Sequence, residues 1–272
     1  MTTEKMIRKP VVAGQFYKGN EALLTKEVAD LTPQKKETLD AKGVVSPHAG
    51  YIYSGPVAGE VLSSIKPKPT YIILGPNHTG YGKPFGLDSE RTWKTPLGEI
   101  EINKELGRAI LKHSQYIEKD SLCHNHEHSI EVQLPFLQYL NKDFDFVPVV
   151  ISYADRKSYK NVGKELAAAV KGLKKPVTII ASSDMTHYEP HQEAKKKDMM
   201  AIEKILALDI DGFLDTIDKY NISMCGFAPT AIMMRAAIEL GAEKAKLIKY
   251  NTSGDTSADY SQVVGYAGIV LY

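Results

Sequence analysis

The chain has 272 residues, of which 43% are hydrophobic and 25% charged, and its formal net charge is +1. This composition is that of a soluble globular protein. Because lysine and arginine are spread along the whole chain, the sequence lacks the basic stripe of a nucleic-acid-binding protein, and no apolar run is long enough to cross a membrane. The chain has only two cysteines and no apolar signal segment at its start, so a disulfide framework is excluded and a cytoplasmic location is predicted.

Short apolar runs of β type alternate with helical patterns from residue 40 onward. The predicted strands are residues 43–46, 71–74, 144–152, 177–182, 246–251 and 264–271. The predicted helices are residues 56–65, 104–113, 128–140, 157–173, 192–208 and 228–240. Such alternation is typical of a three-layer α/β/α fold with a mostly parallel central sheet.

One region departs from this alternation. Residues 85–88 and 98–102 flank a polar stretch that contains Trp93 and Pro96, which predicts a hairpin added to the main sheet. No linker, charge block or internal repeat divides the chain. Residues 1–272 are therefore predicted to form a single α/β domain.

Three histidines each follow a short apolar run and lie in a turn rich in glycine, proline or serine: His48, His78 and His187. Taken singly, each could be a turn or capping histidine. In an open α/β sheet, however, ligands bind outside the carboxyl ends of the strands. The three histidines are thus predicted to converge on one crevice, where they would suit a metal site or an acid–base site.

Two neighbours of these histidines are further candidates. Asn77, beside His78, could orient a substrate, although an asparagine here is equally typical of an Asx-turn. Asp184 lies in the same turn as His187, and a carboxylate beside a histidine fixes its tautomer and raises its basicity. The pair is therefore predicted to act as a general base or to support a neighbouring ligand from behind, with helix N-capping by Asp184 or Ser183 as the alternative.

The densest group of potential metal ligands is the segment from Cys123 to His128. It does not match the H-E-x-x-H pattern. We interpret it as a loop leading into a helix, from which one or both of His126 and His128 reach the pocket; a three-ligand metal site within the segment, which would include His124, is the alternative. Cys225 precedes a further apolar helix. A helix N-terminus lowers a thiol pKa and makes the thiol a better ligand or nucleophile, but a free cysteine is equally typical of a small buried side chain.

Together these segments resemble the Memo family, which in bacteria and archaea also appears as component B of the AmmeMemoRadiSam system. The resemblance covers nearly the whole chain. The residues that carry it are Ser46-Pro47-His48-Ala49-Gly50-Tyr51, Gly75-Pro76-Asn77-His78, Thr95-Pro96-Leu97-Gly98, Glu127-His128-Ser129-Ile130-Glu131, Ser183-Asp184-Met185-Thr186-His187 and Cys225-Gly226.

The resemblance implies a fold similar to that of the class III extradiol ring-cleaving dioxygenases, in which two histidines and a glutamate hold Fe(II). By this likeness His48 and His78 are metal ligands, Cys225 replaces the carboxylate as the third ligand, and His187 is the catalytic base. The thiolate shifts the preference from iron(II) toward copper or zinc. The resemblance also implies AMMECR-type and radical SAM proteins as partners.

Three functions follow as hypotheses. The first is a metal-dependent redox or oxygenase-like enzyme with one iron(II) or copper ion, in which Asp184 orients the base His187 and the substrate contacts Asn77, His126 or His128. The second is a non-enzymatic module that binds a phosphopeptide or another anionic ligand in the same cleft. The third is a metal-dependent amide hydrolase, because a metal-bound water and His187 would serve equally well.

Overall fold

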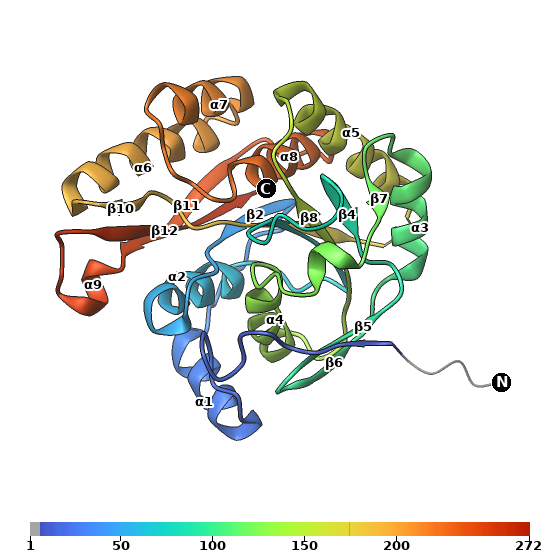
Figure 1. The fold of residues 1–272 in the computed structure, drawn as a ribbon, viewed down its shortest axis with the longest axis horizontal. Helices are drawn as coiled ribbons and strands as arrows, with labels where there is room; N and C mark the ends of the chain where they lie inside the picture. The colour runs from blue at the N-terminus through green and yellow to red at the C-terminus, as the bar shows by residue number, and fades with distance from the viewer. Residues whose placement is uncertain (1–5, 174) are drawn as a thin grey trace.

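Four parallel strands form the centre of the main sheet. The computed structural model, which describes residues 6–173 and 175–272, places them in the order β2 (Gly43–Ser46), β9 (Val177–Ser182), β3 (Thr70–Pro76) and β8 (Asp145–Ile151) (Figure 1). Every residue of β9 and β3 is buried, as expected for strands covered on both faces. Because the four strands are parallel, their carboxyl ends lie along one edge of the sheet.

Antiparallel strands extend the sheet on both sides of this centre. Next to β2, β12 (Val263–Leu271) runs antiparallel and pairs in turn with β11 (Ala245–Thr252) and β10 (His187–Glu189). Next to β8, β4 (Phe85–Leu87) runs antiparallel and pairs with β7 (Glu118–Lys119). Over the described residues this makes a nine-stranded mixed sheet, so the predicted parallel arrangement describes its centre and not its edges.

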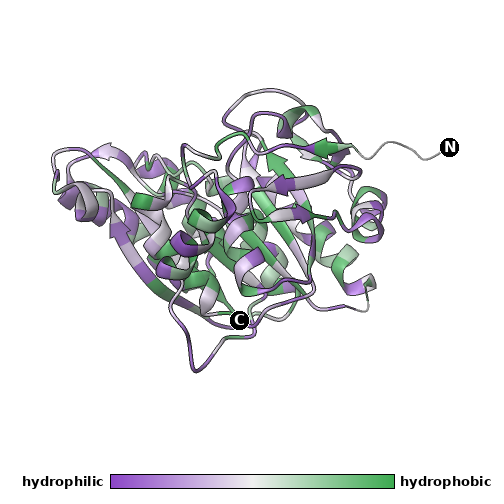
Figure 2. Ribbon diagram, turned by 90° about the horizontal axis from the view of Figure 1, so that it is seen from below, coloured by the Kyte–Doolittle hydropathy of each residue, from purple (hydrophilic) through white to green (hydrophobic). Residues whose placement is uncertain are grey.

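Helices cover both faces of the sheet, and a separate hydrophobic cluster lies under each set. On one face lie α1 (Glu21–Leu31), α2 (Tyr51–Ser63) and α4 (Leu134–Leu140). On the other lie α3 (Lys104–His113), α5 (Arg156–Gly172), α6 (His191–Leu206), α7 (Ile210–Lys219) and α8 (Phe227–Glu239). Figure 2 shows the hydrophobic strands enclosed by helices with hydrophilic outer faces. The three-layer α/β/α fold is thus confirmed, and no helix in the described part of the chain has the length and apolarity to cross a membrane.

The predicted hairpin is wrong in its strands and in its location. The first predicted segment contains β4, which joins the main sheet. The hairpin instead consists of β5 (Thr92–Thr95) and β6 (Gly98–Ile100), which form a small separate sheet with β1 (Ile7–Arg8). The polar stretch is itself a strand because Trp93 is buried beneath the guanidinium of Arg8, 4.3 Å from its ring centroid.

Several helix boundaries also differ from those predicted, and α1 and α7 lie outside the predicted helices. Helix α2 begins at Tyr51, so Pro56 is inside it. Proline has no N–H to donate to the carbonyl of Ile52, one turn earlier, and the hydroxyl of Thr256 donates to that carbonyl at 3.3 Å. The segment 128–140 becomes helical only at the short 3₁₀ turn Glu131–Gln133 that leads into α4, so His128 lies in the preceding loop.

Candidate metal centre

The carboxyl edge of the central strands carries the candidate site. Strand β2 ends just before His48, β3 just before His78, and β9 just before Asp184. Because β9 lies between β2 and β3, the three turns are neighbours in space. This is the crevice in which open α/β sheets bind ligands.

Three imidazoles meet at this edge. One ring nitrogen from each of His48, His78 and His128 lies within 4.8 Å of the others. The rings of His78 and His128 are stacked with their centroids 4.8 Å apart, and the His48 ring stands edge-on to His78 at 5.2 Å. Neutral imidazole nitrogens are ligands for zinc, copper, iron and nickel, so the arrangement has the donor chemistry of a transition-metal site.

The tautomer of His48 is fixed by Ser182. The hydroxyl of Ser182 donates its single hydrogen to the carbonyl of Ser129 at 2.7 Å. It can therefore only accept from His48, whose Nδ1 lies 2.9 Å away, so His48 carries its hydrogen on Nδ1. Burial, reinforced by the neighbouring His78 and His128, holds the pKa of His48 well below its usual range. The neutral ring thus presents the lone pair of Nε2.

His78 is held by the buried carboxylate of Glu127. The backbone N–H of His78 donates to Glu127 Oε2 at 2.6 Å, and its Nδ1 lies 2.9 Å from Oε1. Burial favours a lower pKa for His78, but the hydrogen bond and charge of Glu127 outweigh it and raise that pKa. Burial likewise favours a higher pKa for Glu127, yet its bonds to His78 and to Ser129 N–H lower it to about 2. A carboxylate behind a histidine in this way is typical of metal sites, because it directs the other ring nitrogen outward.

Of the histidines between Cys123 and His128, only His128 belongs to the cluster. His126 is exposed and is not among the residues that line the cavity described below. His124 is fully buried and its Nε2 lies 3.0 Å from the carbonyl of Gly86, which gives it a structural role. His128 was expected to contact substrate; the structure places it at the cavity and among the potential metal ligands.

Cys225 lies beside His48, in the turn before α8, and outside the group formed by the three imidazoles. Its Sγ is 3.3 Å from His48 Nε2 and accepts the backbone N–H of Asp184, also at 3.3 Å. The helix N-terminus was expected to lower the thiol pKa. In the metal-free site, burial and the charge of Asp184 raise the pKa of Cys225 instead, so its thiol is protonated until a cation approaches it.

His187 and Asp184 line one cavity of about 190 Å³ together with His48, His78 and His128. The Nδ1 of His187 lies 2.8 Å from the carbonyl of Ser223. This carbonyl, in place of the expected Asp184, fixes the ring with its hydrogen on Nδ1 and leaves Nε2 free to accept a proton. Asp184 accepts the backbone N–H of His48 at 2.8 Å, and the chain continues into β10, so it does not cap a helix.

Asn77 organises its own turn. Its Oδ1 accepts the backbone N–H groups of Thr79 and Gly80, and its Nδ2 donates to the carbonyl of Tyr81 and to Ser152. These contacts are those of the Asx-turn alternative. Asn77 lines a second cavity of about 190 Å³, which also reaches Cys225.

Comparison with known proteins agrees with the sequence motifs. A model for the family described as Memo-like protein matches residues 8–270. The chain belongs to the Memo family. It is 44% identical to the MEMO1 family proteins of Methanopyrus kandleri (98% of this chain, 99% of that protein), Methanosarcina acetivorans (97%, 99%) and Archaeoglobus fulgidus (97%, 99%). The resemblance to the Memo family inferred from the sequence is thereby confirmed.

A solved structure shares the fold of this Memo-family chain. It is an uncharacterized protein of Escherichia coli K12, with a TM-score of 0.53 and 11% sequence identity, covering 84% of this chain and 98% of that one. At this identity the likeness supports the α/β fold and carries nothing about activity.

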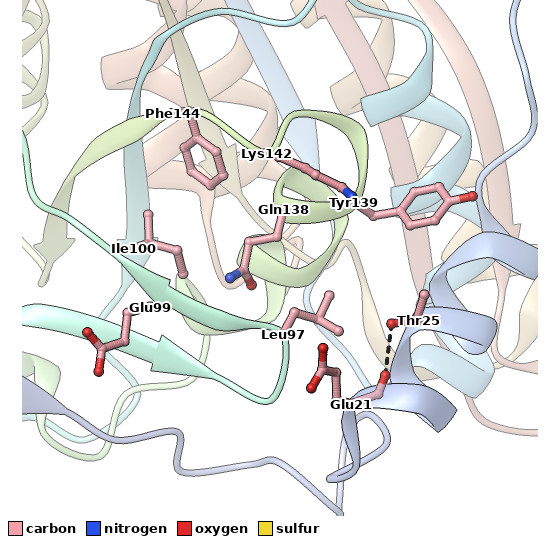
Figure 3. A pocket seen from close by; sticks show the side chains of 9 residues that line it. All are labelled: Glu21, Thr25, Leu97, Glu99, Ile100, Gln138, Tyr139, Lys142 and Phe144. Carbon is pink, nitrogen blue, oxygen red and sulfur yellow. Dashed lines mark hydrogen bonds between the residues drawn. The ribbon is translucent and has the colours of Figure 1, made fainter.

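A larger cavity in this Memo-family chain, of about 520 Å³, lies between α1, the end of α4 and the β5–β6 hairpin (Figure 3). Its lining contains no histidine or cysteine. Two of its polar side chains are used locally, because Thr25 donates to the carbonyl of Glu21 and Gln138 accepts from Thr95. Size alone therefore does not make it the functional site.

Sequence reasoning missed the role of Glu127. Glu127 lies within one of the family motifs, but the sequence alone assigns it no function. Its position beside His128 was the available signal, since a buried acid next to a metal-binding histidine is a common outer ligand. Its actual partner, His78, is 49 positions away, a distance that no local pattern can bridge.

Proposed function

We propose that this Memo-family protein is a metal-dependent redox enzyme of oxygenase-like character, with one iron(II) or copper ion as its cofactor. The observation that carries the proposal is the meeting of His48, His78 and His128 within 4.8 Å. His48 and His78 would hold the ion, with His128 or Cys225 as the further donor.

The residues fit such an ion in three respects. His48 is neutral with its lone pair on Nε2, and Glu127 directs the His78 ring. The 3.3 Å between Cys225 Sγ and His48 Nε2 is short enough for both atoms to bind the same ion. When bound, an ion of this kind supplies Lewis acidity or electron transfer at positions left open by the protein. A thiolate in the set favours copper or zinc, and three imidazoles alone would equally suit iron.

The chain itself supplies a base and a cavity beside the candidate ligands. His187 would take a proton from a substrate at Nε2, because the Ser223 carbonyl holds the hydrogen on Nδ1. The cavity of about 190 Å³ is bordered by Phe16 and Tyr188 and has room for a small molecule or for one group of a larger one. Phe16 packs edge-on against His128 at 4.9 Å and so shields one side of the ring from water.

Elemental analysis of protein purified without oxygen tests the proposal. The wild-type protein is expected to carry close to one iron or copper per chain, and His48→Ala to carry none. Cys225→Ser and His128→Asn identify the further donor, because the variant that removes it loses metal. His126→Ala, an exposed histidine outside the cluster, serves as the matched control and keeps its metal.

Full metal occupancy in His48→Ala contradicts the assignment. A folded wild-type protein without metal would support the alternative in which the cleft binds an anionic ligand without turnover. Zinc in place of iron or copper would favour the hydrolase alternative, for which His187 would act on a metal-bound water.

A further inference from the structure

Tyr266, on strand β12, lines the histidine cavity, and its hydroxyl differs from those of the other buried tyrosines. Its side chain is 2% exposed. The hydroxyls of Tyr17, Tyr51, Tyr71 and Tyr159 each have a hydrogen-bond partner within the protein. Among the described residues, the hydroxyl of Tyr266 has none. The hydroxyl is not closed off from solvent within the protein, so it is available to a ligand that enters the cavity.

We propose that Tyr266 donates a hydrogen bond to a carbonyl oxygen of a small neutral ligand bound in the histidine cavity. The inference rests on the proposed function in that this ligand is taken to be the substrate of the metal site. Tyr266 and the three imidazoles line the same cavity of about 190 Å³, so one small molecule can contact both.

The chemistry of the cavity selects the ligand. Burial and the nearby charge of Asp184 raise the pKa of Tyr266, which keeps the phenol protonated and makes it a donor. The ligand must therefore offer an acceptor oxygen. A carboxylate or phosphate oxygen beside Tyr266 would also approach the carboxylate of Asp184, which lines the same cavity. An uncharged acceptor such as the carbonyl of an amide, ester or ketone avoids this repulsion.

Urea unfolding of the metal-free chain tests whether the hydroxyl is unpartnered. Tyr71 is the matched control, since it is also 2% exposed and its hydroxyl accepts the backbone N–H of Lys68 at 3.0 Å. Tyr266→Phe is expected to leave the unfolding midpoint unchanged or to raise it, and Tyr71→Phe to lower it. An equal lowering in both variants would show that Tyr266 bonds to the protein and would overturn the proposal.

Ligand-observed NMR on the same metal-free chain at pH 8 tests the acceptor, with benzamide as the carbonyl probe and benzoate as its charged counterpart. We expect benzamide to bind more tightly than benzoate, and Tyr266→Phe to weaken benzamide about 3- to 10-fold, while Tyr71→Phe binds it as the wild type does. Absence of benzamide binding, tighter binding of benzoate, or equal benzamide affinity in Tyr266→Phe overturns the proposal. Neither experiment uses metal. Their outcomes therefore do not depend on whether the protein is found to bind a metal ion.

Discussion

Glu127 holds His78 at two points, the backbone N–H and the ring Nδ1, although 49 positions separate the two residues. The same carboxylate also accepts the backbone N–H of Ser129, so it joins the turn after β3 to the loop that carries His128. Two candidate ligands from distant parts of the chain thus depend on one buried acid.

Replacing this acid is expected to weaken metal binding without removing any ligand. Glu127→Gln keeps the size of the side chain but loses the negative charge that orients and polarises His78, and such outer contacts are worth about 10- to 100-fold in metal affinity. Competition titration with a coloured chelator measures the change. Glu118→Gln, a surface carboxylate 54% exposed, is the control and should bind as the wild type does. Equal metal affinities in both variants would show that Glu127 does not support metal binding.

The Glu127–His78 pair also makes the stability of the metal-free protein depend on pH. The pKa of Glu127 is lowered to about 2 from 4.5, so its contribution is complete above pH 4.5 and disappears as the pH falls through 2. The pKa of His78 is raised above 6.5, so its contribution is complete below pH 6.5 and declines as the pH rises through that raised value. The stability difference between wild type and Glu127→Gln should therefore be largest between pH 4.5 and 6.5, on the order of 3 kcal/mol. Denaturant unfolding across this range checks it, and a pH-independent difference would contradict it.

Ser182→Ala is expected to impair both stability and metal binding. The variant removes the acceptor of His48 Nδ1–H and the donor to the Ser129 carbonyl, leaving buried groups unpaired at a cost of about 1–3 kcal/mol. It also frees His48 to turn or change tautomer. Ser63→Ala, which loses only a bond to a carbonyl of its own helix, is the comparison in urea unfolding and metal titration. Wild-type metal affinity in Ser182→Ala would show that the tautomer of His48 is set by other means.

Arg8→Met is expected to destabilise the fold by about 3–5 kcal/mol, because it leaves the fully buried Glu131 without its ion-pair partner. Arg8 also donates to the carbonyls of His124 and Glu127, so the loop that carries His128 should loosen. Lys83→Met, which breaks an exposed pair with Glu118, should cost less than about 1 kcal/mol. Thermal and urea unfolding compare the two variants. If both lose less than about 1 kcal/mol of stability, the buried pair contributes little.

The sequence was sufficient for the fold wherever local pattern and burial coincide. Strands β3 and β9 are apolar throughout because helices cover both their faces, and α3 is amphipathic with matching boundaries. The hairpin was misassigned because β5 has a polar sequence whose burial depends on Arg8, which is distant in the chain.

The candidate site was predictable only where its residues are marked by local features of the sequence. The positions of His48 and His78 follow from strand ends, which are local features. The roles of Glu127 and Ser223 depend on contacts between distant segments, and the choice of His128 over His126 depends on where a loop turns. A pattern in one segment holds no information about such contacts.

The donors of the candidate site enter from four separate segments, and 177 positions separate His48 from Cys225. No short stretch of the chain gathers His48, His78 and Cys225, so an unfolded chain cannot chelate a metal as the native protein would. Metal binding and folding are then thermodynamically linked, and each tenfold excess of free metal over its dissociation constant adds about 1.4 kcal/mol to the stability of the native state. Loss of the metal would then indicate that the sheet has opened. A cell short of the metal would contain a less stable population of the same protein.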